Sequence, residues 1–194
     1  MASLPWQQKL VSIFNSKVTL SPEAEEALLS FWKHAQTFKR NEYLIERGQL
    51  ETRLFFILKG SLRIFFPHDE EEICVGFGYD HNLICSFPSF ILQKPSDYYM
   101  QVLATTEVVA IKRQDFYMLL DQHPTLERAW RMLEEDALLG KIERETEMLT
   151  FTSEERYNRL MERSPHIFQI IPRKYLASYL RMTPETLSRM KPGH

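Results

Sequence analysis

Short apolar or alternating runs separated by turn residues fill the region from about Lys39 to Ile111, and they restrict this part of the chain to a β structure. The separating residues are Gly48, Lys59-Gly60, Pro67-His68-Asp69, Gly78 and Lys94-Pro95. Strands spaced by about 8–12 residues with such turns predict a small antiparallel barrel or roll. The six predicted strands are Tyr43–Ile45, Leu54–Leu58, Leu62–Phe66, Ile73–Phe77, Tyr98–Leu103 and Glu107–Ile111.

Helical periodicity flanks the predicted roll on both sides. Before it, Ser21-Pro22-Glu23 is typical of a helix start, and the apolar residues from Ala24 to Trp32 follow at helical spacing. After it, a short helix is predicted around Gln114–Leu120, and His123-Pro124 opens a helix that reaches about Thr150. We therefore expect an α+β fold, in which an N-terminal antiparallel β-roll (cupin- or jelly-roll-like) is flanked by helices and followed by a long helix.

The long helix carries an apolar stripe that needs a partner. A helix of about 26 residues is about 40 Å long, which is more than a domain of this size covers. The stripe therefore predicts a homodimer in which the helix packs against its own copy. The alternative is that the helix packs on the roll of its own chain. The predicted dimerisation residues are Leu126, Trp130, Leu133, Ala137 and Ile142.

The last two dozen residues are typical of two short helices joined by a tight turn. Pro172 and Thr183-Pro184 are helix-start signals, and the small Ala177 allows the two helices to cross closely. Basic and other polar side chains remain on the outer faces. This combination predicts a C-terminal helix-turn-helix domain whose second helix enters a DNA major groove, and a generic helical hairpin is the alternative.

The charge of the chain is unevenly distributed. From Arg156 to the end there are eight Lys/Arg and two acidic residues, so this end carries six net positive charges in a chain of net charge −2. Such asymmetry is typical of a nucleic-acid-binding end joined to an acidic domain. A break near Thr150, followed by the capping box Thr152…Glu155, marks the boundary. The predicted domains are a sensor roll at 1–123, the long helix at 124–150 and a DNA-binding domain at 151–194.

Composition excludes several classes of protein. No run of about 18 apolar residues is present and the N-terminus is too polar for a secretory signal, so we expect a cytoplasmic protein without a membrane partner. Cys74 and Cys85 are too few for a disulfide framework or an iron–sulfur cluster, and we expect two inert buried thiols. The histidines lack metal-ligand spacing, so neither metal nor cofactor is expected. No nucleophile–base pair or Gly-rich phosphate loop indicates an enzyme.

The order of roll, long helix and helix pair resembles the Crp/Fnr family of bacterial transcription regulators. The stretch from Gly48 through Phe56-Ile57-Leu58-Lys59-Gly60-Ser61-Leu62-Arg63 looks like the family's F-I-x-x-G-x-x-R hairpin, and the stretch from Ala177 to Arg189 looks like its helix-turn-helix. The run that begins at Pro184 is similar to a subgroup common in Bacteroidetes. The resemblance implies a cyclic-nucleotide-binding-like effector domain and a homodimer on a palindromic double-stranded DNA operator, in contact with RNA polymerase.

The cassette with which the family binds a cyclic phosphate is missing here. Aligning on Thr106-Glu107-Val108 places Cys85-Ser86 where the family has Gly-Glu, and Ser96-Asp97 where it has Arg-Ser or Arg-Thr. A buried phosphate without a cation is costly, so we expect a degenerate effector pocket with an unknown small-molecule effector or none. Four nearby aromatic residues either line an apolar pocket or pack in the core: Phe87, Phe90, Tyr98 and Tyr99.

The resemblance also assigns roles in the second helix of the C-terminal pair. Glu185 and Arg189 match the family's two base-reading positions, and Arg181 stands where the family usually has a glycine with a left-handed backbone. We expect a dimeric DNA-binding transcription regulator. The alternative is a ligand-sensing or protein-interaction module whose C-terminal helices do not bind DNA. The predicted DNA-binding residues are Arg173, Lys174, Thr183, Glu185, Thr186, Ser188, Arg189 and Lys191.

Overall fold

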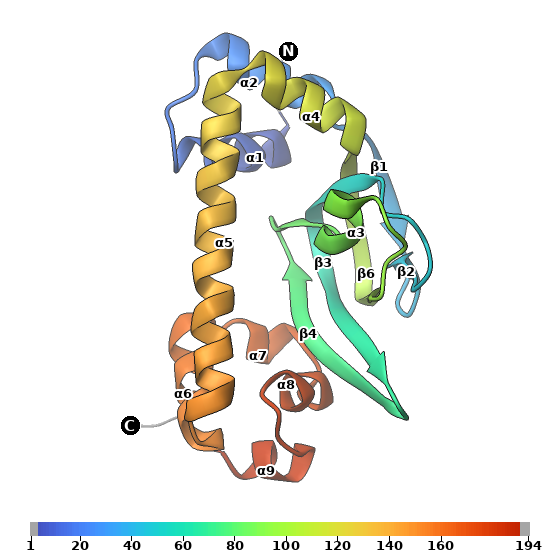
Figure 1. The fold of residues 1–194 in the computed structure, drawn as a ribbon, viewed down its shortest axis with the longest axis vertical. Helices are drawn as coiled ribbons and strands as arrows, with labels where there is room; N and C mark the ends of the chain where they lie inside the picture. The colour runs from blue at the N-terminus through green and yellow to red at the C-terminus, as the bar shows by residue number, and fades with distance from the viewer. Residues whose placement is uncertain (1–3, 191–194) are drawn as a thin grey trace.

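The centre of the fold is an antiparallel sheet of six strands, in a computed structural model that describes residues 4–190 (Figure 1). The strand order is β1-β6-β3-β4, with β2 paired to β6 and β5 paired to β3. This arrangement confirms the prediction of an α+β fold with an antiparallel β core. The strands are β1 (Lys33–Phe38), β2 (Tyr43–Ile45), β3 (Arg53–His68), β4 (Glu71–Tyr79), β5 (Leu83–Ile84) and β6 (Tyr99–Lys112).

Strand β3 continues through a position that looks like a turn in the sequence. It unites the predicted strands Leu54–Leu58 and Leu62–Phe66, so the prediction that Lys59-Gly60 separates two strands is wrong. Gly60 bends the strand instead. Its φ is 120°, and a Cβ atom there would lie 2.6 Å from the Cα atom of Thr106 on β6. Only glycine allows β3 and β6 to approach so closely at this bend.

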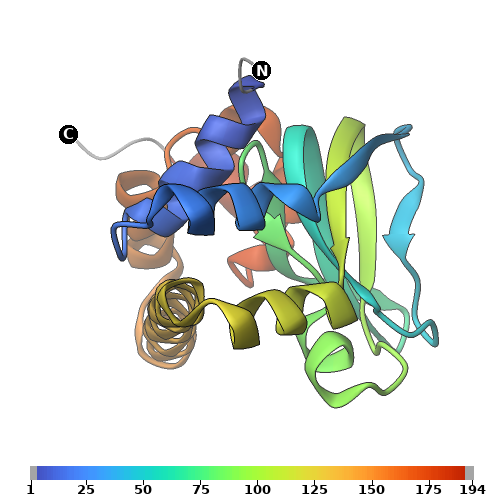
Figure 2. The same ribbon diagram turned by 90° about the horizontal axis from the view of Figure 1, so that it is seen from above.

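Four helices pack against the sheet and share a large apolar core with it (Figure 2). The Ser21 hydroxyl caps α2 as predicted, by accepting a hydrogen bond of 3.3 Å from the Ala24 N–H. Helix α2 ends at Ser30, however, so Phe31 and Trp32 lie beyond it. The helices are α1 (Pro5–Asn15), α2 (Pro22–Ser30), α3 (Phe87–Leu92) and α4 (Arg113–Gln122).

Helix α5 (Pro124–Thr150) has the bounds that the sequence predicts, but its first half lies in the core of its own chain. Leu126 is fully buried, and the Trp130 ring contacts Phe14 of α1 and Phe116 of α4 with centroids 6.5 and 4.8 Å apart. The assignment of Leu126 and Trp130 to a dimer stripe is therefore corrected, because α1 and α4 already cover them. Leu133 is half-buried against the same core.

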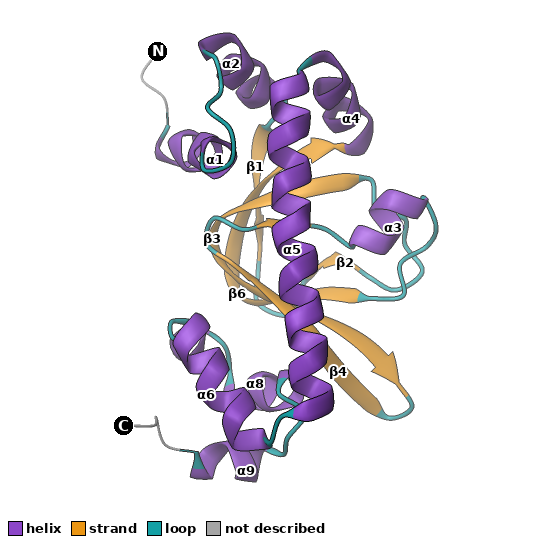
Figure 3. Cartoon of the chain, turned by 60° about the vertical axis from the view of Figure 1, so that its left-hand side comes forward, coloured by secondary structure: helices purple, strands orange, loops and turns teal. Residues whose placement is uncertain are grey.

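The second half of α5 leaves this core and runs past the sheet to the C-terminal helices (Figure 3). Here Ala137 is exposed, and so are Leu138, Leu139 and Ile142, at 60%, 64% and 51%. None of the helices in residues 4–190 has both the length and the apolar composition needed to cross a bilayer.

Four short helices follow α5 and form a separate apolar cluster beside β4. The predicted capping box starts the first of them: the Thr152 hydroxyl accepts from the Glu155 N–H, and the Glu155 carboxylate accepts from the Thr152 N–H at 2.8 Å. The cluster also includes Leu103 of β6, with Phe77 and Tyr79 of β4 packed against it. The helices are α6 (Ser153–Arg163), α7 (Ile167–Ile170), α8 (Arg173–Tyr179) and α9 (Pro184–Arg189).

Candidate nucleic-acid interface and effector pocket

Helices α8 and α9 are joined by a tight left-handed turn. Arg181 has a φ of 55°, and the Met182 N–H donates 3.0 Å to the Ala177 carbonyl, which closes α8. A left-handed arginine costs roughly 1 kcal/mol relative to glycine. Arg156 of α6 offsets this cost, because its guanidinium donates to the Leu180 carbonyl at 2.9 Å and to the Arg181 carbonyl at 3.3 Å. Arg181 thus has the left-handed backbone that the resemblance gives to a glycine at this position.

The apolar faces of α8 and α9 are buried and their polar faces point outward. Leu176 and Ala177 of α8 pack with Leu187 of α9, all at most 1% exposed. The Thr183 hydroxyl caps α9 by accepting 3.1 Å from the Thr186 N–H. Pro184 in the first turn and this cap fix the start of the helix.

The structure describes seven of the eight residues predicted to bind DNA. Thr186 is half-buried, and its hydroxyl lies 3.1 Å from that of Thr183. The Ser188 hydroxyl donates to the Glu185 carbonyl at 2.8 Å, so its hydrogen-bond donor is already used within the helix. Lys191 lies outside the described residues. The exposed members of the set are Arg173, Lys174, Thr183, Glu185, Ser188 and Arg189.

Helix α8 is docked on the edge strand β4 through a serine that the sequence analysis did not single out. The Ser178 hydroxyl accepts 3.0 Å from the Cys74 N–H and donates 3.2 Å to the Glu72 carbonyl. The Ser178 side chain thus forms hydrogen bonds with both a backbone N–H and a backbone carbonyl at the edge of the strand. Beside it, the rings of Phe77 and Tyr179 lie 5.2 Å apart.

Arg63 of β3 lies beneath this contact. It is only 3% exposed, and its guanidinium is 4.0 Å from the Phe65 ring centroid and 4.1 Å from the Tyr175 ring centroid. It donates to Gln101 at 2.9 Å and pairs with Glu72 at 2.5 Å. The sequence marked Arg63 only as part of a hairpin motif, whereas the structure places it between the sheet and α8.

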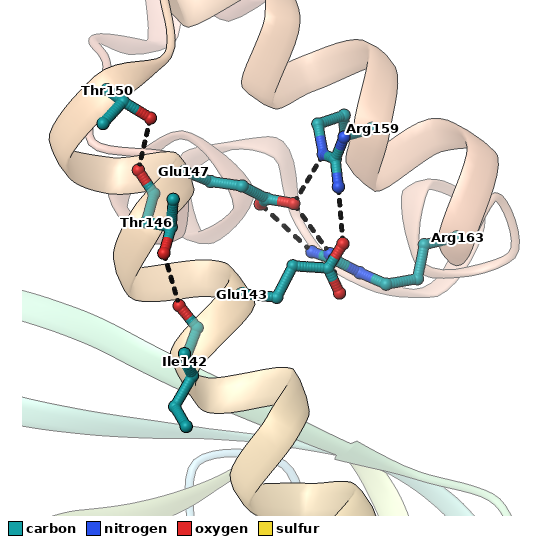
Figure 4. A network of polar contacts seen from close by, with 7 residues as sticks. All are labelled: Ile142, Glu143, Thr146, Glu147, Thr150, Arg159 and Arg163. Carbon is teal, nitrogen blue, oxygen red and sulfur yellow. Dashed lines mark hydrogen bonds and ion pairs between the residues drawn. The ribbon is translucent and has the colours of Figure 1, made fainter.

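Ionic contacts join the end of α5 to α6 (Figure 4). Arg159 donates to Glu147 at 2.8 Å and to Glu143 at 2.5 Å, and Arg163 donates to Glu147 at 3.0 Å. Burial of Glu147 raises its pKa, but the hydrogen bonds and charges of the two arginines outweigh burial and hold the pKa below 4.5. Glu147 is therefore ionised at neutral pH and fixes the direction in which α6 leaves the long helix.

The four residues predicted to form the degenerate effector pocket separate into two groups. Ser86 and Ser96 come together, with their hydroxyl oxygens 2.8 Å apart and both residues at most 3% exposed. Ser96 also bonds the Tyr98 carbonyl and N–H at 2.9 and 3.1 Å. Cys85 is buried in the large core, whereas Asp97 is exposed. A closed pair of hydroxyls therefore occupies the place where the resemblance puts a glutamate and an arginine.

The aromatic residues near this pair contribute mainly to packing. Phe90 is 1% exposed within the core, and Phe87 packs against the same core. Tyr99 stacks on Phe65 with ring centroids 4.9 Å apart.

The free cysteines Cys74 and Cys85 are buried, and burial raises the pKa of the Cys74 thiol to about 12. Neither is a thiolate at neutral pH.

Glu51 is a buried carboxyl group beside α3 that the sequence analysis missed. It is 2% exposed; its Oε1 atom accepts 3.0 Å from the Arg53 N–H, while Oε2 has no hydrogen-bond partner in the described part of the chain. Burial raises its pKa to about 7 despite the nearby charge of Arg53. Nothing in the local sequence indicates this, because Leu50-Glu51-Thr52 is typical of a polar turn.

Comparison with known proteins agrees with this architecture. Residues 35–123 match the sequence model of the Cyclic nucleotide-binding domain family. No curated protein sequence matches significantly.

Solved structures of similar fold come from several bacteria. The Catabolite Activator Protein of Thermus thermophilus is 20% identical with a TM-score of 0.57, over 89% of this chain and 82% of that one. The c-di-GMP responsive global regulator CLP of Xanthomonas campestris is 15% identical with a TM-score of 0.65, over 87% and 89%. FixK2 of Bradyrhizobium japonicum is 14% identical with a TM-score of 0.68, over 80% and 81%. The chain therefore shares the fold of these proteins, with a match to the cyclic nucleotide-binding domain at residues 35–123.

Proposed function

We propose that this chain is a dimeric transcription regulator that binds double-stranded DNA through α8 and α9 as a helix-turn-helix. The observation that carries the proposal is the helix pair itself: buried apolar faces, a left-handed turn and a capped second helix whose outer face is polar. Helix α9 lies at the end of the molecule opposite α1 and α2 (Figure 1). The excess of basic residues in this part of the chain supplies the charge that attracts a phosphate backbone.

Within α9, we assign base reading to two side chains. Glu185 and Arg189 are exposed and four residues apart, so they share one face of the helix. A glutamate accepts from a cytosine amino group, and an arginine donates to guanine. Arg173 and Lys174 at the start of α8 are exposed and suit phosphate contacts, which position the protein without reading sequence.

Dimerisation would use the second half of α5. The apolar side chains Leu138, Leu139 and Ile142 are exposed there, and a second copy of the helix would bury them. Two copies would present two α9 helices to the half-sites of a palindromic operator. RNA polymerase is the partner through which such a regulator acts on transcription. We retain 1–123, 124–150 and 151–194 as its sensor, dimerisation and DNA-binding parts.

The sensor part is not suited to a cyclic nucleotide bound in the manner of the matched domain. The buried Ser86–Ser96 pair supplies no cation for a cyclic phosphate. We therefore expect no binding of cyclic AMP in calorimetric titrations. A dissociation constant in the micromolar range would contradict this inference.

Replacing Arg189 with alanine tests the proposed function most directly. We expect Arg189→Ala to weaken binding to the preferred operator by about 1–3 kcal/mol and to relax the base preference at one position in each half-site. Selection of bound duplexes from a random pool, performed with the wild type and the variant, measures both effects.

Lys174→Ala is the matched control, because it removes one positive charge from α8 rather than α9. It should weaken all sequences alike and flatten the dependence of affinity on salt. If the wild type selects no sequence and binds no duplex at low salt, the helix pair does not bind DNA. If Arg189→Ala selects the same palindrome as strongly as the wild type, Arg189 is not a base reader.

A further inference from the structure

A groove of about 910 Å³ lies between the start of β3, the end of β6 and helix α4. It is separate from the Ser86–Ser96 pair and from the C-terminal helices, neither of which lines it. Three cationic side chains line the groove: Arg53, Lys112 and Arg113. Asp121 is the one carboxylate in the lining. A volume of this size suits a small organic molecule.

The backbone brings the three cationic residues together where β3, β6 and α4 meet. Arg53 of β3 and Lys112 of β6 are direct partners in the antiparallel register, and Arg113 follows at once. Like charges on directly opposite residues destabilise a strand pair. The Arg113 N–H donates 2.8 Å to the Thr52 carbonyl, which holds the start of α4 against the start of β3. This junction therefore keeps the backbones of the three cationic residues close together.

These cations lack the carboxylate partners that other arginines of the chain have. Arg63, Arg159 and Arg163 each pair with glutamate, but no ion pair within residues 4–190 involves Arg53, Lys112 or Arg113. Arg53 lies near Glu51, but burial of that carboxyl raises its pKa to about 7 and reduces the negative charge that it can offer. The groove thus keeps a net positive charge.

The Arg113 guanidinium is held in place before any ligand arrives. Its Nε atom donates 2.6 Å to the Phe90 carbonyl, and its Cζ atom lies 4.6 Å from the Tyr117 ring centroid. A side chain fixed in this way loses little rotamer freedom when it binds an anion.

We propose that this groove binds a small molecule carrying at least two phosphoryl groups. Two planar guanidinium groups and one ammonium group match the terminal oxygens of phosphates, and three cations match a charge of −2 or more. Gln93 and Gln114 in the lining offer amide groups, and Met118 offers an apolar surface, to the organic part. The groove is a second ligand site of the sensor part and does not depend on whether the chain binds DNA.

Calorimetry with inorganic pyrophosphate and the full chain tests the proposal. We expect a dissociation constant in the micromolar range, weakened about ten-fold or more by Lys112→Gln and by Arg113→Gln. Lys112 is exposed, so its replacement leaves the fold intact even if Arg113→Gln destabilises it. Arg128→Gln on α5 removes the same charge outside the groove and should leave affinity unchanged.

Two further titrations test whether binding is specific to the groove and to phosphoryl groups. Lys174→Gln at the proposed DNA-binding end should have no effect, and citrate should bind more weakly than pyrophosphate. The proposal is overturned if pyrophosphate does not bind, if Arg128→Gln or Lys174→Gln weakens binding as much as Lys112→Gln, or if citrate binds more tightly. It also fails if Lys112→Gln weakens duplex DNA binding but not pyrophosphate binding, since the groove would then serve a nucleic acid backbone.

Discussion

We expect the double change Leu138→Glu with Ile142→Glu to convert a dimer into a monomer without unfolding the chain. Both side chains are more than half exposed, so glutamates there meet water in a single chain but would be buried and unpaired between two copies of α5. Burying an unpaired charge costs several kcal/mol, whereas fully burying one leucine or isoleucine side chain contributes about 1.5–3 kcal/mol. Light scattering should give twice the chain mass of 23.1 kDa for the wild type and 23.1 kDa for the variant.

The control for this prediction adds two acidic side chains elsewhere. Gln8→Glu with Thr125→Glu changes the charge by the same amount at exposed positions of α1 and the start of α5, and this variant should stay dimeric. Leu133 is unsuitable for the test because it packs on the core of its own chain. A wild type that scatters as a monomer at tens of micromolar would rule out the proposed interface.

Replacing Glu51 with glutamine should stabilise the protein at alkaline pH by about 3 kcal/mol, since the pKa lies near 7 in the folded chain against 4.5 when exposed. The folded chain holds this proton more tightly than the unfolded chain does. The free energy of unfolding of the wild type should therefore fall as pH rises from about 4.5 to about 7, and stay low above that. Glutamine does not titrate and should remove this loss.

Urea unfolding at pH 5 and pH 8 measures the effect. The gain of Glu51→Gln over the wild type should be small at pH 5 and nearly complete at pH 8. Glu46→Gln, at an exposed position in the turn after β2, is the control and should follow the wild type at both values. Equal pH dependence in the wild type and Glu51→Gln would show that Glu51 is ionised in the folded chain at no cost.

Local signals in the sequence predicted local structure well. The caps at Ser21, Thr152 and Thr183 start helices as expected, because each hydroxyl satisfies a backbone N–H only a few residues away. The sequence wrongly predicts a strand boundary at Gly60, where the structure has a bend within β3. The glycine signals a special backbone there, but its neighbour Thr106 on β6, which decides between a turn and a bend, is remote in sequence.

The apolar stripe of α5 shows what periodicity leaves open. Trp130 and Ile142 recur at helical spacing on the same helix, yet one lies in the core of its own chain and the other is exposed. Periodicity predicts that a face must be covered but not by which element. The first half of the helix packs on its own chain, which is the alternative interpretation, and dimerisation through the exposed second half stays a prediction.

Some features of the candidate sites follow from local sequence spacing, whereas others depend on contacts between distant parts of the chain. Glu185 and Arg189 could be placed on one face of α9 from their spacing alone. The contact between Ser178 and Glu72 joins residues 106 positions apart, and no local pattern announces it. The pairing of Arg53 with Lys112 likewise depends on the strand register.

The Ser178 contact also affects whether the edge of the sheet can pair with another molecule. Strand β4 is an edge of the sheet, and free N–H and C=O groups on an edge can pair with an extended segment of any neighbouring molecule. The serine hydroxyl occupies the Cys74 N–H and the Glu72 carbonyl, and α8 lies over the strand. The C-terminal helices thereby cover this edge of the sheet against pairing with another molecule, and the cover lasts only while they remain docked.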